Sequence, residues 1–175
     1  MKPDYKNWVP RGLLFLLGGM AAVCLAVCVV FGMAGVATEG GFRIALGVLF
    51  GAAFLLFAVL TGIFVNMYCA FSYNGKRKIS KRVIEGIAKY VILPDGGRGL
   101  DVGCGSGALT IACAKRNPHA QMVGIDRWGK EYASFNLPLC ERNAEAEGVR
   151  NVSFLRGNAV KLDFPDKTFD AVTSN

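Results

Sequence analysis

Apolar and charged positions divide this 175-residue chain into two unlike parts. Residues 12–37 are 26 consecutive uncharged positions, and a helix of this length measures about 39 Å at 1.5 Å per residue. A second uncharged and mostly apolar run extends from Ile44 to about Phe71, with only residues 38–43 between the two. Because the hydrocarbon core of a bilayer is about 30 Å thick, each run is long enough to cross it. The pattern therefore predicts a transmembrane helical hairpin over residues 12–73.

A cleaved signal peptide is the alternative interpretation of the first run. The apolar core of a signal peptide has about 7 to 15 residues, and this run is much longer. Its twelve Leu, Phe and Val residues contribute about −4 to −7 kcal/mol on an insertion scale, before the less favourable glycines are counted. Two membrane spans are therefore the favoured interpretation.

After the second apolar run, the pattern changes to short segments that alternate between helix and strand. Apolar residues at helical spacing predict a helix from Ile79 to Val91, which the Pro-Asp-Gly-Gly sequence at residues 94–97 ends. The predicted strands are residues 99–102, 121–125, 152–156 and 169–173, and the predicted helices between them are residues 108–116 and 130–147. Such alternation forms parallel sheets through right-handed crossovers. The predicted class is thus α/β, a Rossmann-like parallel sheet with about four strands.

The net charge of +7 is concentrated beside the predicted membrane spans. Residues 1–11 carry three basic residues and one acidic residue, and residues 76–98 carry seven basic and two acidic residues. Residues 99–175 carry nine of each sign and are neutral overall. Because basic residues flank spans on the cytoplasmic side, we expect both termini and the α/β domain in the cytoplasm, anchored to the lipid bilayer. This topology accounts for the positive charge, so no nucleic-acid partner is expected.

The chain is accordingly divided into four parts: a cytoplasmic N-terminus (1–11), the hairpin (12–73), a basic juxtamembrane linker and helix (74–98) and a partial α/β domain (99–175). Its six cysteines show neither CxxC spacing nor clustered histidines, so neither a disulfide framework nor a metal site is predicted. Within the hairpin, Cys24 and Cys28 share one helix face, as do Gly47 and Gly51. This spacing favours helix packing and leaves open a homo-oligomer formed through the hairpin.

Residues with binding chemistry follow the predicted strands. Three alternate glycines, Gly103, Gly105 and Gly107, come directly after the first strand, and Asp126 ends the second. Residues 157–159 (Gly-Asn-Ala) follow the third strand, and residues 174–175 (Ser-Asn) follow the fourth. Parallel sheets bind ligands beyond the carboxyl ends of their strands. Glycines allow close backbone approach, and a carboxylate at this distance accepts hydrogen bonds from ribose hydroxyls.

The first of these segments, Asp101-Val102-Gly103-Cys104-Gly105-Ser106-Gly107, resembles the Asp/Glu-x-Gly-x-Gly-x-Gly motif of class I S-adenosylmethionine-dependent methyltransferases. The resemblance implies that the glycine loop holds the methionine part of S-adenosylmethionine, Asp126 the ribose, and the residues around Asn158 the adenine. The family more often has Asp at the Asn158 position. The cofactor-binding residues that the resemblance implies are Asp101, Gly103, Cys104, Gly105, Gly107, Asp126, Arg127, Asn158 and Ala159.

A nicotinamide-dinucleotide site is the main alternative, because Gly103-x-Gly105-x-x-Ala108 also satisfies the dinucleotide-binding fingerprint. Asp101, the third glycine and the Phe169-Asp170 start of the fourth strand favour the methyltransferase. A non-catalytic, membrane-tethered module that binds S-adenosylmethionine would use the same residues. Trp128, Tyr132 and Phe135 are candidates either for a pocket wall or for helix packing.

Catalytic residues and the methyl acceptor are not defined by this pattern. Asn175 is a candidate for a position near the transferred methyl group. The resembled family has seven strands, so we expect an incomplete domain with little or no turnover of its own. An assembled fragment or truncated reading frame, a degenerate protein and a half-domain completed by another chain all remain open.

Overall fold

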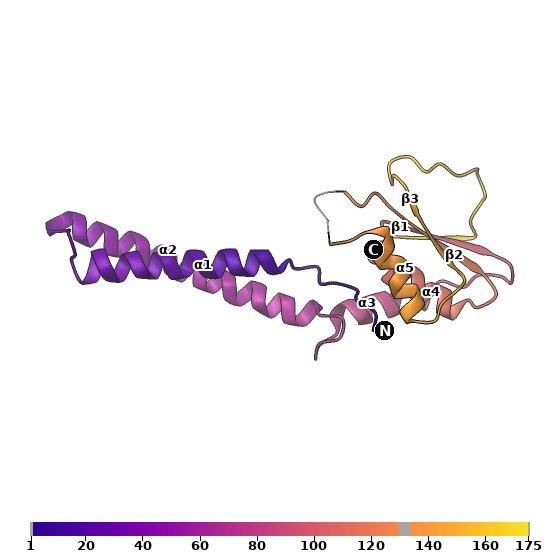
Figure 1. The fold of residues 1–175 in the computed structure, drawn as a ribbon, viewed down its shortest axis with the longest axis horizontal. Coiled ribbons are helices and arrows are strands. Elements are labelled where there is room, and N and C mark those ends of the chain that lie inside the picture. The colour runs from indigo at the N-terminus through magenta and orange to yellow at the C-terminus, as the bar shows by residue number, and fades with distance from the viewer. Residues whose placement is uncertain (1, 130–133, 175) are drawn as a thin grey trace. The chain divides into compact units, whose positions relative to one another are not determined.

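The computed structural model describes residues 2–129 and 134–174. The chain forms two compact units, of which one is Asn7–Arg77 and the other combines Met1–Lys6 with Lys78–Asn175 (Figure 1). The first unit is a helical hairpin. The second is an α/β unit, and it includes the N-terminal end of the chain.

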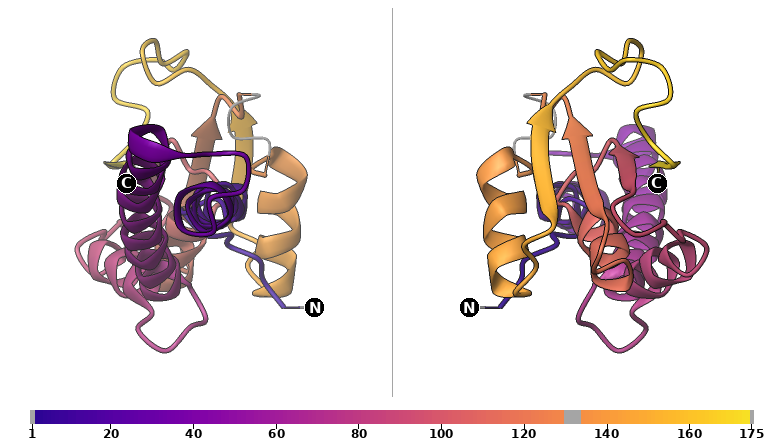
Figure 2. Two further views of the ribbon diagram at one scale, coloured as in Figure 1. Left: turned by 90° about the vertical axis from the view of Figure 1, so that its left-hand side faces the viewer. Right: turned by 90° about the vertical axis from the view of Figure 1, so that its right-hand side faces the viewer.

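Four parallel strands make up the sheet of the α/β unit. They are β1 (Arg98–Val102), β2 (Gln121–Asp126), β3 (Val152–Arg156) and β4 (Ala171–Ser174), in the spatial order β3-β2-β1-β4. Figure 2 shows the arrowheads of β1, β2 and β3 at the same edge of the sheet. The predicted Rossmann-like α/β class is confirmed, with β1 in the interior of the sheet between β2 and β4.

Helices cover one face of this sheet. Helix α4 (Ala108–Arg116) packs on β1, β2 and β3, with α3 (Ile79–Ala88) and α5 (Leu137–Ala146) beside it. Gly124 permits this close packing, because a Cβ atom there would lie 2.8 Å from Thr110 Oγ1 of α4. The opposite face carries the apolar cluster of Leu100, Val123 and Ile125. Phe164 and Phe169, from the connection between β3 and β4, pack against this cluster with their rings edge to face.

The predicted helix over residues 130–147 is wrong at its start. Residues 130–133 lie outside the described residues, and α5 begins at Leu137, after a turn at Ser134. Asn136 caps the helix, since its Oδ1 accepts a hydrogen bond from the Leu139 N–H at 2.9 Å. Pro138 stands in the first turn, where its missing N–H costs no helical hydrogen bond. A cap and a proline together outweigh the apolar spacing that suggested an earlier start.

The hairpin unit consists of α1 (Arg11–Val27), which continues as the π-helical segment η1 (Cys28–Met33), and α2 (Gly40–Phe71). The connection between the helices lies at residues 34–39, somewhat earlier than predicted. Arg43 secures this end, because its guanidinium donates to the carbonyls of Gly32 and Met33. A Cβ atom on Gly32 would lie 2.5 Å from Gly47 Cα. The two helices thus approach backbone to backbone at these glycines.

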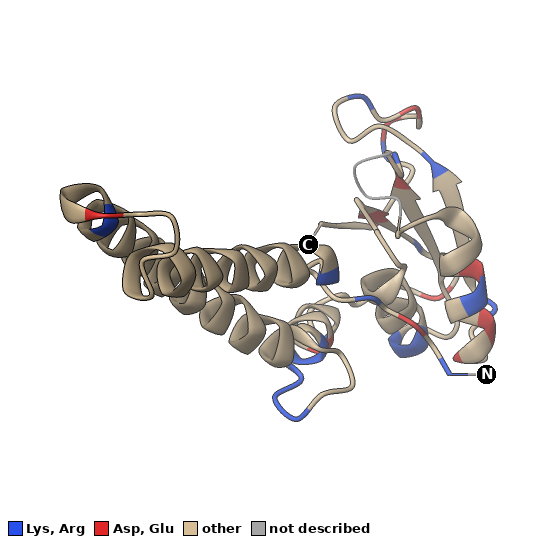
Figure 3. Cartoon of the chain, turned by 60° about the vertical axis from the view of Figure 1, so that its left-hand side comes forward, with Lys and Arg blue, Asp and Glu red and all other residues tan. Residues whose placement is uncertain are grey.

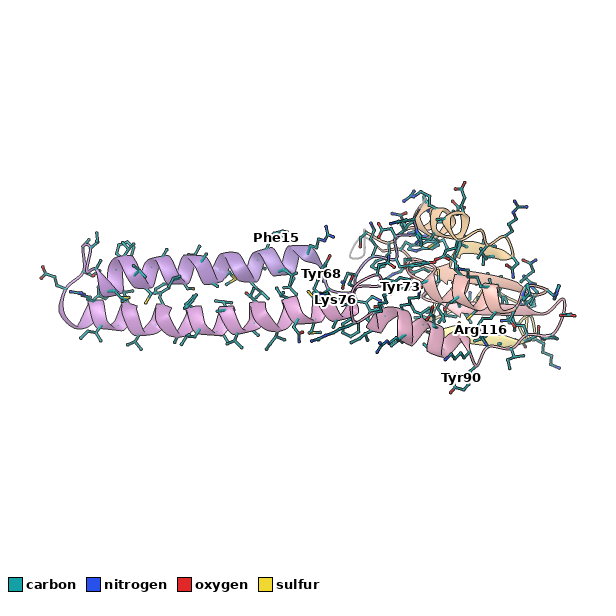
Figure 4. The ribbon with its side chains drawn as sticks, turned by 90° about the horizontal axis from the view of Figure 1, so that it is seen from below. Phe15, Tyr68, Tyr73, Lys76, Tyr90 and Arg116 are labelled. Atoms are coloured by element: carbon teal, nitrogen blue, oxygen red, sulfur yellow. The ribbon has the colours of Figure 1, made fainter. Side chains whose placement is uncertain are left out.

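Length and composition make both helices of the hairpin candidate membrane spans, one of 23 residues (Arg11–Met33) and one of 32 residues (Gly40–Phe71). Charged residues within the hairpin gather at its ends, as Figure 3 shows by colour. At the other end of α2, Trp8 stacks on Phe71 and the Arg11 Nε donates to the Tyr68 hydroxyl at 2.7 Å. Tyr68 is labelled in Figure 4. Aromatic and basic side chains are therefore grouped at the end opposite the helical connection.

Candidate cofactor-binding site

The glycine loop between β1 and α4 depends on left-handed backbone conformations. Gly103, Gly105 and Gly107 have φ values of +77°, +55° and +78°, which side-chain-bearing residues rarely adopt. The N–H groups of Gly103 and Cys104 both donate to the Ile125 carbonyl, at 2.8 and 3.0 Å. These bonds attach the loop to the end of β2, where the sequence predicted that a ligand would bind.

Asp126 joins three segments at this edge of the sheet. Its Oδ2 accepts the Gly105 N–H at 2.9 Å, and its Oδ1 accepts the Trp128 N–H at 2.8 Å. Its backbone carbonyl accepts the N–H of Gly157 at 3.0 Å. The half-buried Asp126 carboxylate is consequently within reach of both the glycine loop and the segment that follows β3.

The other residues expected on the adenine side are exposed next to Asp126. Asn158 and Ala159 follow Gly157, and the Asn158 Oδ1 accepts the Val160 N–H at 3.0 Å to form a local turn. The Asn158 amide nitrogen therefore stays available as a donor while the oxygen stabilises the turn. Arg127, another of the cofactor-binding residues that the resemblance implies, is also exposed.

Asp101 lies on β1, two residues before the first glycine of the loop, and is only 1% exposed. Thr110 Oγ1 of α4 donates to one of its carboxylate oxygens at 2.6 Å, and Thr173 Oγ1 of β4 to the other at 3.1 Å. Burial raises the pKa of this carboxyl, an effect that the two threonine hydrogen bonds partly oppose. The sequence grouped Asp101 with the cofactor contacts, but in the structure its side chain connects β1, α4 and β4.

Cys104 offers a ligand its backbone rather than its thiol. The side chain is buried, and the hydrogen bond with Cys140 of α5, together with burial, raises the pKa of Cys104. The Cys140 thiol also donates to the Gly105 carbonyl at 3.2 Å. Both side chains are buried, so they act as small apolar groups that support the loop.

Two aromatic residues lie against the loop. The Trp128 indole Nε1 donates to the Gly105 carbonyl at 2.9 Å, and the Phe135 ring lies 3.7 Å from the position of a Cβ on Gly105. Both residues are half-buried and precede α5. This placement favours the pocket-wall interpretation over helix packing; Tyr132, grouped with them from the sequence, lies outside the described residues.

The N-terminal segment contacts the glycine loop, which the sequence pattern did not predict. Asn143 of α5, only 2% exposed, donates through its amide to the carbonyls of Asp4 and Ser106, at 3.1 and 3.0 Å. In return, its Oδ1 accepts the Asp4 N–H at 2.7 Å, and the Ser106 hydroxyl donates to the Tyr5 carbonyl at 3.2 Å. The sequence offered one indication of this contact. Asn143 lies on the helix face that carries Leu139 and Cys140, and an amide buried on such a face needs hydrogen-bond partners.

The carboxyl end of β4 lies beside that of β1, with Ser174 paired to Val102. Asn175, the candidate near the transferred methyl group, lies outside the described residues and stays a prediction. The predicted glycine loop, Asp126, Asn158 and the end of β4 therefore share one edge of the sheet.

The comparisons with known proteins agree with one another on the kind of protein that this chain resembles. Residues 93–175 match the family described as "Methyltransferase domain". The demethylmenaquinone methyltransferase of Geobacillus stearothermophilus is 38% identical over 79 residues, which are 45% of this chain and 32% of that protein. The release factor glutamine methyltransferase of Geobacter sulfurreducens is 40% identical over 76 residues, which are 43% of this chain and 24% of that protein.

A solved structure, the YcgJ protein of Bacillus subtilis, aligns with 29% identity and a TM-score of 0.44, over 54% of this chain and 37% of that chain. The fold assignment itself rests on the strand order described above. The chain spans about a third or less of the length of these curated relatives.

Proposed function

Because residues 93–175 are a methyltransferase domain of the S-adenosylmethionine-dependent class, we propose that the whole protein is a membrane-anchored methyltransferase. The observation that carries this proposal is the position of Asp126, which links the glycine loop to the segment after β3. The dinucleotide alternative loses its support, because both relatives compared above are methyltransferases.

The residues at this edge fit S-adenosylmethionine. The Asp126 carboxylate can accept hydrogen bonds from the ribose hydroxyls, and the exposed Asn158 amide lies on the side where an adenine edge would be recognised. The amino-terminal end of α4, directly after Gly107, favours the methionine carboxylate because the first N–H groups of a helix are positively polarised. The residues that would hold the cofactor are the glycine loop, Asp126, Arg127, Asn158 and Ala159.

When bound, the cofactor supplies an electrophilic methyl group on a sulfonium. Methyl transfer is a displacement, so the protein contributes chiefly by aligning the two partners and excluding water. Asp126 and the glycine loop provide orientation, while Trp128 and Phe135 contact the loop at Gly105. The buried Asp101 positions the loop by holding β1 against α4 and β4.

Anchoring to the bilayer is the second part of the proposal. It is supported by two long apolar helices whose outward side chains are largely exposed, among them Phe15, Ile44 and Val48. Exposed apolar surface of this extent is typical of helices that face lipid. The charge distribution places both termini and the methyltransferase domain on the cytoplasmic side.

The methyl acceptor has to be identified by experiment, since the names of the relatives include both a quinone and a protein as acceptors. Tethering favours an acceptor in or near the bilayer, such as a lipid, a quinone-like molecule or a membrane protein.

The test uses the full chain purified in lipid nanodiscs. Calorimetry is expected to detect S-adenosylmethionine binding and no binding of NADH or NADPH. Binding of a nicotinamide cofactor without S-adenosylmethionine binding would overturn the cofactor assignment.

Retention of the chain in the membrane fraction after alkaline carbonate extraction tests the anchor separately. Release into the supernatant would refute the two-span topology while leaving the cofactor result unaffected.

A further inference from the structure

Helix α3 has a buried face and an exposed face. Ser80, Ile84 and Ala88 recur every four residues and are buried within the α/β unit. On the other side, Arg82 and Lys89 are exposed, two helical turns apart. The exposed face is therefore basic and available for contact with a partner.

Apolar side chains are exposed on the same side of the helix and just after it. Val83 is 37% exposed, and Tyr90, seven residues later, is 89% exposed. Ile92, at the start of the connection to β1, is 83% exposed. Tyr90 is labelled in Figure 4, where it projects away from the ribbon. We call Lys78, Arg82, Val83, Lys89, Tyr90 and Ile92 the α3 surface.

Most of the net charge of the α/β unit comes from α3 and its flanking residues. Residues 78–98 carry five basic residues against Glu85 and Asp95, whereas residues 99–175 are neutral overall. Lys78, Arg82 and Lys89 of the α3 surface are three of these five basic residues. Glu85 forms an ion pair with Lys81 at 3.6 Å, one turn away on the helix. The α3 surface is thus suited to an anionic partner that also accepts apolar side chains.

Chain length limits where this partner can be. Helix α2 ends at Phe71 and α3 begins at Ile79. The seven intervening residues, 72–78, can extend at most about 25 Å. If α2 crosses a bilayer, the start of α3 is held within this distance of the lipid headgroups.

We propose that the α3 surface lies on an anionic bilayer surface. Tyr90 and Ile92 contact the headgroup and upper acyl region, and Lys78, Arg82 and Lys89 interact with lipid phosphates. Tyrosine prefers this interface, and lysine and arginine are attracted to anionic lipids. The inference rests on the proposed membrane anchor and adds a second contact, which orients the methyltransferase domain relative to the membrane.

The experiment replaces Ile92 by a diazirine-bearing amino acid in the full chain, reconstituted in proteoliposomes. A matched control carries the same photoreactive residue at Val160, which is 94% exposed on the connection between β3 and β4. After illumination, mass spectrometry identifies what each position has captured. We expect lipid adducts at position 92, more in phosphatidylcholine mixed with phosphatidylglycerol than in phosphatidylcholine alone, and few adducts at position 160.

Charge variants test whether the basic residues of the α3 surface contribute to the contact with anionic lipid. Arg82→Gln combined with Lys89→Gln is expected to reduce lipid capture at position 92 in anionic vesicles by about fivefold or more, with no change at position 160. Capture of a second copy of the chain, or equal lipid capture at positions 92 and 160, would overturn the proposal. Carbonate extraction of the same vesicles reports on the anchor, so failure of the α3 contact and failure of the anchor are separate results.

Discussion

The carboxylate of Asp126 accepts the backbone N–H of Gly105 at 2.9 Å, across the gap between the end of β2 and the glycine loop. Through this bond the charged residue is already held beside the loop. Its second oxygen accepts the Trp128 N–H at 2.8 Å. Both oxygens therefore have defined directions before any ligand is considered, which lowers the ordering cost of binding.

The Asp126 carboxylate is expected to account for much of the cofactor affinity. Asp126→Asn keeps the size of the side chain but loses its charge, and one oxygen acceptor becomes a donor. Because hydrogen bonds to charged groups contribute about 1.5–3 kcal/mol, the Kd for S-adenosylmethionine should rise by about tenfold or more. Calorimetry on the full chain measures this change. Asp166→Asn, at an exposed position, is the control, and an equal effect of both variants would contradict the assignment.

The conformation of Gly107 is expected to make alanine costly there. The residue has a φ of +78°, and a Cβ atom would lie 2.9 Å from the Phe154 ring. Gly107→Ala should lower the free energy of unfolding by about 1–3 kcal/mol, as left-handed strain and overpacking add. Gly148→Ala is the matched control, because its φ is +68° but its Cβ would meet open space. Thermal unfolding compares the two variants, and an equal cost would argue against the contact with Phe154.

The buried Asp101 carboxyl gives stability a pH dependence of defined sign. Burial raises its pKa, so the folded chain binds this proton more tightly than the unfolded chain does. The resulting stabilisation is fully present below the unfolded-state pKa of about 3.9 and is lost as the pH rises through the folded-state pKa. Asp101→Asn cannot ionise, so the stability of the variant relative to the parent should increase with pH above about 4. Thermal unfolding across this range tests the prediction, and a difference independent of pH would contradict it.

Asn143 is expected to stabilise both the N-terminal segment and the glycine loop. Asn143→Leu removes a buried amide and leaves the Asp4 N–H and the carbonyls of Asp4 and Ser106 without this partner. The expected loss in unfolding free energy is about 2 kcal/mol or more, because the Ser106 carbonyl is buried and a buried backbone group is costly when unsatisfied. Hydrogen exchange should increase at residues 4–5 and in the glycine loop together.

Tyr5→Phe is the control for this prediction, because it removes only the hydroxyl that donates to Glu147 at 3.2 Å. Its effect on unfolding should be smaller than that of Asn143→Leu, because it removes one partly buried hydrogen bond and leaves the bonds of Asn143 in place. If Asn143→Leu left hydrogen exchange in the glycine loop unchanged, the loop would be independent of the N-terminal segment.

Local pattern was sufficient to predict the sheet and the edge on which its candidate binding residues lie. Apolar periodicity, together with the glycines between elements, predicts both the class of the sheet and the bounds of α4, residues 108–116. Asp126 could be placed at the ligand edge, because the carboxyl ends of parallel strands meet at one edge whatever the remaining contacts are. Charge also predicts which side of the membrane carries the domain, and this stays a prediction.

Tertiary contacts decided what those patterns do not contain. Asp101 belongs to the same motif as the glycines, yet its side chain bonds to Thr110 and Thr173, the latter 72 positions away in the chain. Residues 4–5 join the glycine loop through Asn143, which is 139 positions from Asp4. Periodicity reports only which face of an element is apolar, and a buried polar group finds its partner through the fold of the whole unit. The sequence thus determined the elements and the edge at which we propose that the cofactor binds, and the tertiary structure decided which residues support that edge.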